Sequence, residues 1–222
     1  MIQIAIDGPA GAGKSTIAKA LAEALNINYM DTGAMYRAMA YAMLARGIAP
    51  GDGARVIPAL SQVDISISYE GDTQKVFIDG EDVTDKIRTP EISKGASDIG
   101  TIKEVRVKLA DIQRKTAGEF PIVMDGREIG TYVLPEAPLK FYITASSRTR
   151  AERRQQDLKA MGIETELDAL EAEIVARDEV DSNREFAPLR RAEDAIYLDT
   201  SELSIDEVVA FAMQKAKEVF SL

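Results

Sequence analysis

The sequence contains no cysteine, no histidine and no tryptophan among its 222 residues. Without cysteine there is no disulfide framework, no thiolate nucleophile and no thiolate metal ligand. Without histidine, imidazole is excluded both as a general base near neutral pH and as a metal ligand. Any catalysis by this chain must therefore use carboxylates, hydroxyls, lysine or arginine.

Long hydrophobic runs and an excess of positive charge are also lacking. The longest apolar stretch, Ala38–Ala45, falls far short of the roughly 18 residues that a membrane helix needs. The first residues, MIQIAIDGPAG, lack the basic region and the long apolar region of a signal peptide. The net charge of −10 disfavours sequence-independent binding to nucleic acid, because such binding neutralises many phosphates. We expect a cytoplasmic protein with neither a membrane nor a nucleic acid polymer as partner.

The remaining composition and the order of apolar segments predict an α/β fold. With 45% hydrophobic residues, the chain can bury one sizeable core and carry an inserted subdomain. The run IQIAID predicts a strand, and GKSTIAKALAEALN, after a glycine loop, has apolar residues at helical spacing. Further short apolar runs predict strands at Phe120–Asp125, Lys140–Ala145 and Ala195–Thr200. Strands that alternate with helices favour parallel pairing, in a sheet core flanked by helices.

One segment departs from this alternation. Between Val63 and Tyr69, apolar and polar residues alternate singly, and the turn signals EGD and DGED follow. This pattern predicts a small antiparallel β insert on the α/β body. Near the end of the chain, Ser204 and Glu207 have the spacing of a capping box, which predicts a final amphipathic helix.

The loop after the first predicted strand carries the strongest functional signal. Gly8, Gly13, Lys14 and Ser15 form the pattern G-x₄-G-K-S between a strand and a helix, which is the context of a Walker A phosphate-binding loop. Backbone N–H groups and the helix N-terminus bind phosphate oxygens, the lysine reaches the β- and γ-phosphates, and the serine binds Mg²⁺. The expected ATP-binding residues are Gly8, Pro9, Ala10, Gly11, Ala12, Gly13, Lys14, Ser15 and Thr16. The alternative is a glycine-rich turn that only connects the strand to the helix.

Such loops serve phosphoryl transfer to a small acceptor, GTPase switching, and hydrolysis coupled to mechanical or nucleic acid work. The Asp-x-x-Gly and Asn-Lys-x-Asp strings of a GTPase are both absent. A helicase or motor would carry a basic or aromatic track for its polymer, and this chain is acidic. The sequence therefore favours a small-molecule kinase.

A kinase must also bind an anionic acceptor, and arginine is suited to a bidentate grip on phosphate oxygens. Arg37 follows DTGAMY, and Arg127 follows a predicted strand at the edge where α/β sheets bind ligands. Arg177, Asp181 and Arg184 are spaced four and three apart, so on a helix they share one face. The alternative readings are isolated surface charges and a solvent-exposed salt-bridge face.

Two further features fit a kinase. Asp125 ends a predicted strand, where a carboxylate binds Mg²⁺ directly or through water, although a turn or helix-cap aspartate also fits there. The basic cluster SSRTRAERR, Ser146–Arg154, opens a helix, and the segment Asp157–Asp178 supplies the helical pair that a lid would need. This region is either a solvated charged face or a lid that closes over ATP and excludes water.

Taken together, DGPAGAGKST, DTGAMYR, DGREIGT and RDEVDSNREFAPL, in this order along nearly the full chain, resemble the bacterial cytidylate kinase family. The resemblance implies a P-loop nucleoside monophosphate kinase fold in a single kinase domain, 1–222. It places a nucleotide-binding insert at about 62–92 and a helical lid at about 148–184. It implies transfer of phosphate from ATP, with Mg²⁺, to CMP or dCMP. We also expect a monomer.

The resemblance assigns roles to residues that match the family's motifs. Binding of the acceptor phosphate falls to Arg37, Arg127 and Arg184, and binding of the ribose to Arg177 and Asp181. Cytosine recognition falls to Ser97, Arg106 and Glu128, where Glu128 replaces the aspartate that usually follows DGR in the family. The implied catalytic residues are Lys14, Arg127, Arg177 and Arg184, and the implied metal-binding residues are Ser15 and Asp125.

Two other functions remain open from the residues themselves. A kinase for UMP or another small acceptor, such as a sugar acid, would use the same loop and arginines. An ATP-responsive binding module would use the loop without transferring phosphate to an acceptor.

Overall fold

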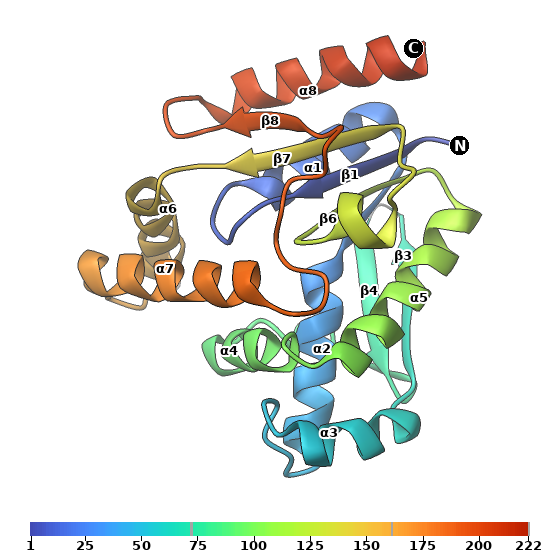
Figure 1. Ribbon diagram of the computed structural model, residues 1–222, viewed down its shortest axis with the longest axis vertical. Coiled ribbons are helices and arrows are strands. Elements are labelled where there is room, and N and C mark those ends of the chain that lie inside the picture. Colours follow the sequence, from blue (N-terminus) through green and yellow to red (C-terminus); the bar gives the residue numbers. More distant parts are fainter. Residues whose placement is uncertain (72, 161, 222) are drawn as a thin grey trace. The chain divides into compact units, whose positions relative to one another are not determined.

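The computed structural model describes residues 1–71, 73–160 and 162–221 (Figure 1). The chain forms two compact units. The first unit combines Met1–Asn26 with Ile122–Leu222, and the second is Ile27–Pro121. The insert boundaries expected at about 62–92 lie within the second unit and stay a prediction, as does the assignment of 1–222 to one kinase domain.

A parallel sheet forms the centre of the first unit. Its strands run in the order β6-β1-β7-β8 and all pair in parallel. Their bounds are Gln3–Asp7 for β1, Ile122–Gly126 for β6, Leu139–Thr144 for β7 and Ile196–Asp199 for β8. These strands confirm the four that the sequence predicts. Ile6 pairs with Asp125 and Asp7 with Gly126, so the carboxyl ends of β1 and β6 lie side by side.

Helices pack on this sheet and on one another. The helix α1 (Lys14–Leu25) packs on β6 and on α8 (Ile205–Phe220), which also contacts β7. Ser204 and Glu207 form the expected capping box at the start of α8. The helices α6 (Ser147–Ala160) and α7 (Leu167–Asn183) lie side by side (Figure 1) and share a small apolar core. That core consists of Ala151, Leu158, Leu170 and Ile174, with Ile163 and Leu167 against it. The expected helical pair of the basic region is therefore present.

The second unit contains the predicted antiparallel insert. The strands β3 (Ile65–Glu70), β4 (Thr73–Ile78) and β5 (Glu81–Asp82) pair in that order and all antiparallel. A strand that the sequence did not reveal, β2 (Asn28–Asp31), precedes α2 (Thr32–Ala45). The other helical elements of this unit are α3 (Gly53–Ala59), η1 (Leu60–Gln62), α4 (Pro90–Ile99) and α5 (Lys103–Glu119).

The parallel sheet with flanking helices and the small antiparallel sheet confirm the predicted α/β fold. Within the described residues, no helix combines the length and the apolarity that crossing a bilayer would require.

Candidate active site

The glycine loop between β1 and α1 is shaped by contacts that only glycine tolerates. Gly8 has a φ of 147°, and a Cβ atom there would meet the carbonyl oxygen of Ile143 at 1.8 Å. Gly13 has a φ of 87° and is the N-cap residue of α1. The loop therefore brings its backbone close to β7 and ends at a helix N-terminus, where N–H groups and the helix dipole favour an anion.

Lys14 is buried at the end of this loop. Its Nζ donates a hydrogen bond to the carbonyl oxygen of Pro9 at 2.7 Å. Burial, and then the nearby positive charge of Arg127, lower the pKa of Lys14 to about 7. A phosphate at the loop would stabilise the charged ammonium, because an opposite charge in a buried site favours ionisation. The lysine is thus held where a bound anion offsets the cost of its burial.

A hydroxyl and a carboxylate meet beside the lysine. Ser15 Oγ donates a hydrogen bond to Asp125 Oδ2 at 2.8 Å, and Asp125 is buried at the carboxyl end of β6. Hydroxyl and carboxylate oxygens are ligands that suit Mg²⁺, which takes one or two protein ligands together with phosphates and water. No group of three or more carboxylate, histidine or cysteine side chains suited to a metal occurs in the described part of the chain. The pair therefore fits Mg²⁺ in a phosphate complex and not an all-protein metal cage.

Asp7 is a buried acid that the sequence did not single out as functional. Its two carboxyl oxygens accept hydrogen bonds from the backbone N–H groups of Ile129 and Gly130, both at 2.7 Å. These residues begin the short helical turn η2 (Ile129–Val133), directly after Arg127 and Glu128. Burial raises the pKa of Asp7 to about 7 in spite of the two backbone hydrogen bonds. The only signal in the sequence was its place at the carboxyl end of a predicted parallel strand.

Asp181 connects two of the predicted arginines. Its Oδ2 accepts from Arg127 Nε at 3.1 Å, and its Oδ1 accepts from Arg184 Nη1 at 3.2 Å. Burial opposes ionisation of Asp181, but Arg127, Arg184 and Arg177 outweigh it and lower the pKa of this carboxyl. Burial likewise opposes the charge of Arg127, yet Asp181 raises its pKa. The side chains of Asp181 and Arg184 are only 9% and 7% exposed, so a solvent-exposed salt-bridge face is the wrong interpretation for this pair.

The expected placement of Arg184 on the helix is also wrong. The helix α7 ends at Asn183, and Arg184 follows with the extended ψ of 138°. Its guanidinium still turns back to Asp181, and its Nη2 lies 3.8 Å from Glu128 Oε2. Arg184 and Glu128 are therefore brought together from two distant parts of the chain.

Three predicted substrate-binding residues belong to the second unit. Arg37 Nη2 pairs with Asp31 Oδ2 at 2.7 Å, and Asp31 also caps α2 by accepting from the backbone N–H of Ala34. Arg106 is 2% exposed, donates from Nη1 to the Gly100 carbonyl at 3.0 Å, and lies 5.7 Å from the centroid of the Tyr36 ring. Ser97 is half-buried on α4.

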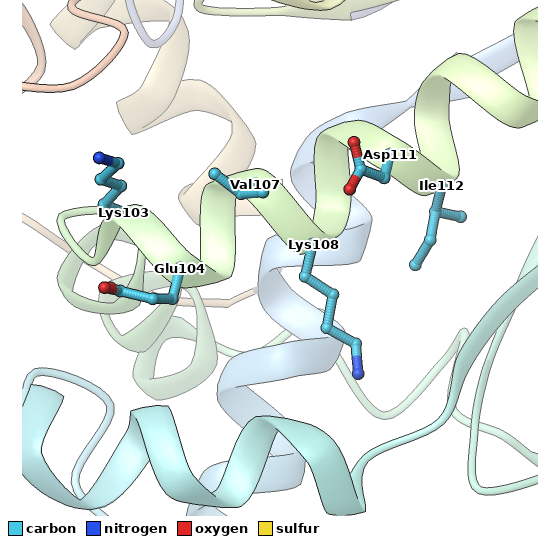
Figure 2. Close-up of a pocket in the computed structure, with 6 residues that line it drawn as sticks. All are labelled: Lys103, Glu104, Val107, Lys108, Asp111 and Ile112. Carbon is cyan, nitrogen blue, oxygen red and sulfur yellow. The ribbon is translucent and has the colours of Figure 1, made fainter.

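A pocket of about 580 Å³ runs along α5 in the same unit and contains none of the predicted site residues (Figure 2). In Figure 2, Lys108 points away from α5, and its Nζ donates to the carbonyls of Leu60 and Val63. The residues that line the pocket are Lys103, Glu104, Val107, Lys108, Asp111 and Ile112.

The fold and the residues of the first unit define a class of protein. A glycine loop after a parallel strand, a buried lysine, a serine–carboxylate pair and a buried arginine group are the parts of a P-loop phosphotransferase. Comparison with known proteins specifies the family. Residues 4–218 match the cytidylate kinase family, and the chain belongs to it.

Curated relatives agree along nearly the full chain. A cytidylate kinase from Caldicellulosiruptor bescii is 50% identical over 219 residues, covering 99% of this chain and 95% of the relative. One from Exiguobacterium sibiricum is 51% identical over 209 residues, covering 94% of both chains. Among solved structures, an uncharacterised protein from Eubacterium ventriosum has the same fold, with a TM-score of 0.56 and 14% identity, covering 98% of this chain and 99% of that one.

Proposed function

We propose that the protein transfers the γ-phosphoryl group of ATP to the phosphate of CMP and dCMP. The observation that carries this proposal is the convergence of charge in the first unit of a chain from the cytidylate kinase family. Arg127 and Arg177 lie close enough to Lys14 to lower its pKa, and Asp125 lies close enough to raise it. This arrangement suits a triphosphate donor and a monophosphate acceptor, which both bring negative charge to one place.

ATP is the donor in this proposal and binds to the glycine loop. Backbone N–H groups of Gly8–Thr16 and the N-terminus of α1 bind its phosphates, and Lys14 moves from the Pro9 carbonyl to the β- and γ-phosphates. Ser15 and Asp125 hold Mg²⁺ with the nucleotide. When bound, Mg²⁺ would neutralise part of the charge of the phosphates.

CMP or dCMP is the acceptor. Arg37, Arg127 and Arg184 bind its phosphate, and Arg177 and Asp181 bind its ribose, as the family resemblance implies. Asp181 holds Arg127 and Arg184 in fixed orientations, because each guanidinium bonds a different oxygen of the same carboxylate. Such preorganised donors lower the cost of ordering side chains when an anion binds.

The base of the acceptor is recognised by Ser97, Arg106 and Glu128. The Glu128 carboxylate accepts a hydrogen bond from the exocyclic amino group of cytosine, a group that uracil lacks. Glu128 is buried, and its carboxylate lies 3.8 Å from the guanidinium of Arg184. A base that offers no donor to a buried acceptor binds much more weakly than one that does.

The chemistry needs no strong general base. The attacking acceptor oxygen already carries negative charge, so alignment of the two phosphates and neutralisation of their charge make up most of the catalysis. Lys14, Arg127, Arg177 and Arg184 supply that neutralisation. The α6–α7 pair acts as a lid that keeps water from the transferring group.

We further propose that the enzyme works as a monomer in the cytoplasm. The insert near 62–92 and the lid near 148–184 serve the acceptor and the donor within a single kinase domain.

The test is ADP release from ATP and Mg²⁺ with CMP, dCMP, UMP, AMP, GMP and shikimate as separate acceptors. We expect fast turnover with CMP and dCMP only. Equal turnover with UMP would retain the kinase and reject the proposed base recognition. ATP hydrolysis independent of every acceptor would instead favour an ATP-responsive binding module.

A further inference from the structure

A buried arginine outside the proposed substrate-binding set connects three parts of the first unit. Arg150, on the first turn of α6, has a side chain that is 7% exposed. Its Nε donates to the carbonyl oxygen of Ala145 at 2.9 Å, and its Nη1 donates to the carbonyl oxygen of Ala10 at 3.1 Å. The same Nη1 lies 2.6 Å from Asp178 Oδ2 on α7. One guanidinium therefore reaches the end of β7, the phosphate-binding loop and α7.

The contact at the loop is close on the backbone side as well. A Cβ atom on Gly11 would meet Arg150 Cβ and the Arg150 carbonyl oxygen, both at 3.2 Å. The start of α6 thus packs directly against the middle of the glycine loop. A displacement of Arg150 would change the shape of the loop that binds ATP phosphates.

The contact at α7 lies within the segment that carries the proposed acceptor-binding and catalytic groups. Asp178 follows Arg177 directly and precedes Asp181 by three residues. Its Oδ2 takes the bond from Arg150, and its Oδ1 is buried without a hydrogen-bond partner. Burial raises the pKa of Asp178, while Arg150 and Arg127 oppose that shift. The Asp178 side chain is 21% exposed, so it is partly buried, and Arg150 is the cation that its Oδ2 contacts.

We propose that Arg150 is a positioning residue for phosphoryl transfer, which fixes the ATP-binding loop to α7 through Ala10 and Asp178. This inference rests on the proposed function. In this role Arg150 acts through its contacts with Ala10 and Asp178 and not through a contact of its own with substrate. It sets the distance between the loop that holds the donor phosphates and the helix that carries Arg177 and Asp181. A misplacement of about 1 Å in such a geometry lowers a rate by on the order of 100-fold.

The variants Arg150→Lys and Asp178→Asn test this role. Lysine keeps the positive charge but lacks the fork that reaches both carbonyls and the carboxylate. Asparagine keeps the shape of Asp178 and removes its charge. The control is Arg114→Met, because Arg114 also pairs with a carboxylate, that of Asp111, at an exposed site outside the loop and the proposed lid.

We expect both test variants to lower kcat by about tenfold or more, with a KM for ATP within about threefold of the wild type. The kcat of the double variant is expected to be no lower than that of the more impaired single variant, because both changes break the same connection. Arg114→Met is expected to keep the wild-type kcat. The proposal would be overturned if both test variants had the kcat of the control. It would also be overturned if the fold-losses in kcat of the two single variants multiplied in the double variant.

Hydrogen exchange keeps the inference testable apart from the reaction. Amides of Gly11–Lys14 are expected to exchange faster in Arg150→Lys and Asp178→Asn than in Arg114→Met, when each variant is measured at the same number of degrees below its own melting temperature. If wild-type protein shows no CMP-dependent turnover, the proposed function fails, and this exchange measurement still decides whether Arg150 holds the loop. Unchanged exchange would reject the positioning role.

Discussion

Single buried side chains in this protein owe their properties to partners that are distant in the sequence. Asp7 ends β1, yet its carboxyl oxygens bind N–H groups of Ile129 and Gly130, more than 120 residues away. Through these bonds Asp7 holds the segment that presents Arg127 and Glu128. The acid is one of the protein's structural supports for the proposed acceptor site, although it was not identified from the sequence.

The raised pKa of Asp7 predicts a pH dependence of stability. In the unfolded chain the carboxyl has its ordinary pKa near 3.8, and in the fold its pKa is about 7. Between these values the folded state retains a proton that the unfolded state has lost. The free energy of unfolding therefore falls as pH rises from about 4 to about 7, by at most about 1.4 kcal/mol per pH unit from this group.

Asp7→Asn removes that titration. We expect the variant to lose this contribution to the pH slope, measured as urea-unfolding free energies at pH 5 and pH 6.5. It should also be less stable at pH 5, by about 1–3 kcal/mol, because the amide offers only one acceptor to the two N–H groups. The control is Asp199→Asn at the end of β8, since hydrogen bonds from Ser201 lower the pKa of Asp199. Its contribution is lost only below about pH 4, so the slope between pH 5 and 6.5 should match the wild type.

At the scale of elements, the phosphate-binding loop is the part whose conformation its sequence specifies most closely. The pattern G-x₄-G-K-S predicted a turn between a strand and a helix, and the structure has β1 ending at Asp7 and α1 beginning at Lys14. The sequence does not reveal why Gly8 must be glycine. The reason is the carbonyl oxygen of Ile143 in β7, which occupies the place of a side chain.

Gly8→Ala is expected to destabilise the protein severely and to abolish ATP binding. A Cβ atom 1.8 Å from a backbone oxygen forces β7 and the loop apart. Gly47→Ala is the matched control, since Gly47 also has a positive φ, of 66°, but nothing lies within 4 Å of its Cβ position. Strain alone costs the control about 1–2 kcal/mol, or roughly 2–8 °C in Tm, and leaves ATP binding intact. Equal melting temperatures in the two variants, from thermal unfolding scans, would contradict this explanation.

The helix α7 illustrates the limit of spacing arguments at this scale. The intervals between Arg177, Asp181 and Arg184 suit one face of a helix, but the helix stops at Asn183. Arg184 reaches Asp181 because the chain turns there and buries both side chains. The spacing predicted that Arg184 and Asp181 lie close together, and the end of the helix at Asn183 determined the geometry of their contact.

At the scale of the whole molecule, the proposed substrate-binding residues divide between the two compact units. The glycine loop, Asp125, Arg127, Glu128 and the arginines of α7 and its end belong to the first unit. Arg37, Ser97 and Arg106 belong to the second. The proposed roles therefore make the second unit an acceptor-binding unit, with no part in binding ATP.

Hydrogen exchange with single substrates tests that division. A non-hydrolysable ATP analogue with Mg²⁺ is expected to slow amide exchange in the first unit alone, around Gly8–Thr16. CMP alone is expected to slow exchange also in α2, α4 and α5, which carry Arg37, Ser97 and Arg106. UMP at the same concentration serves as the control, and we expect weaker protection from it. Protection by CMP that stays within the first unit would contradict the roles proposed for these three residues.

The sequence by itself determined the α/β class, the four strands of the first unit, the antiparallel insert, the capping box of α8 and the glycine loop between β1 and α1. These features depend on local patterns, namely hydrophobic period, turn residues and cap spacing, so neighbouring residues are enough to predict them. The strand β2 was missed because Asn28–Asp31 has only two apolar residues, Tyr29 and Met30, between polar ends, which is too few for a clear pattern.

Only the tertiary structure decided which charged groups are buried together. The bonds donated by η2 to Asp7, by Arg127 to Asp181, and by Arg150 to Ala10 and Asp178 join residues separated by up to 140 positions. Burial then sets the pKa of Asp7 and Lys14 near 7, far from their ordinary values. The electrostatic energy of a charge in water differs little from one position in the chain to another. In the protein interior this energy depends on every neighbouring charge and dipole, and only the fold fixes those neighbours.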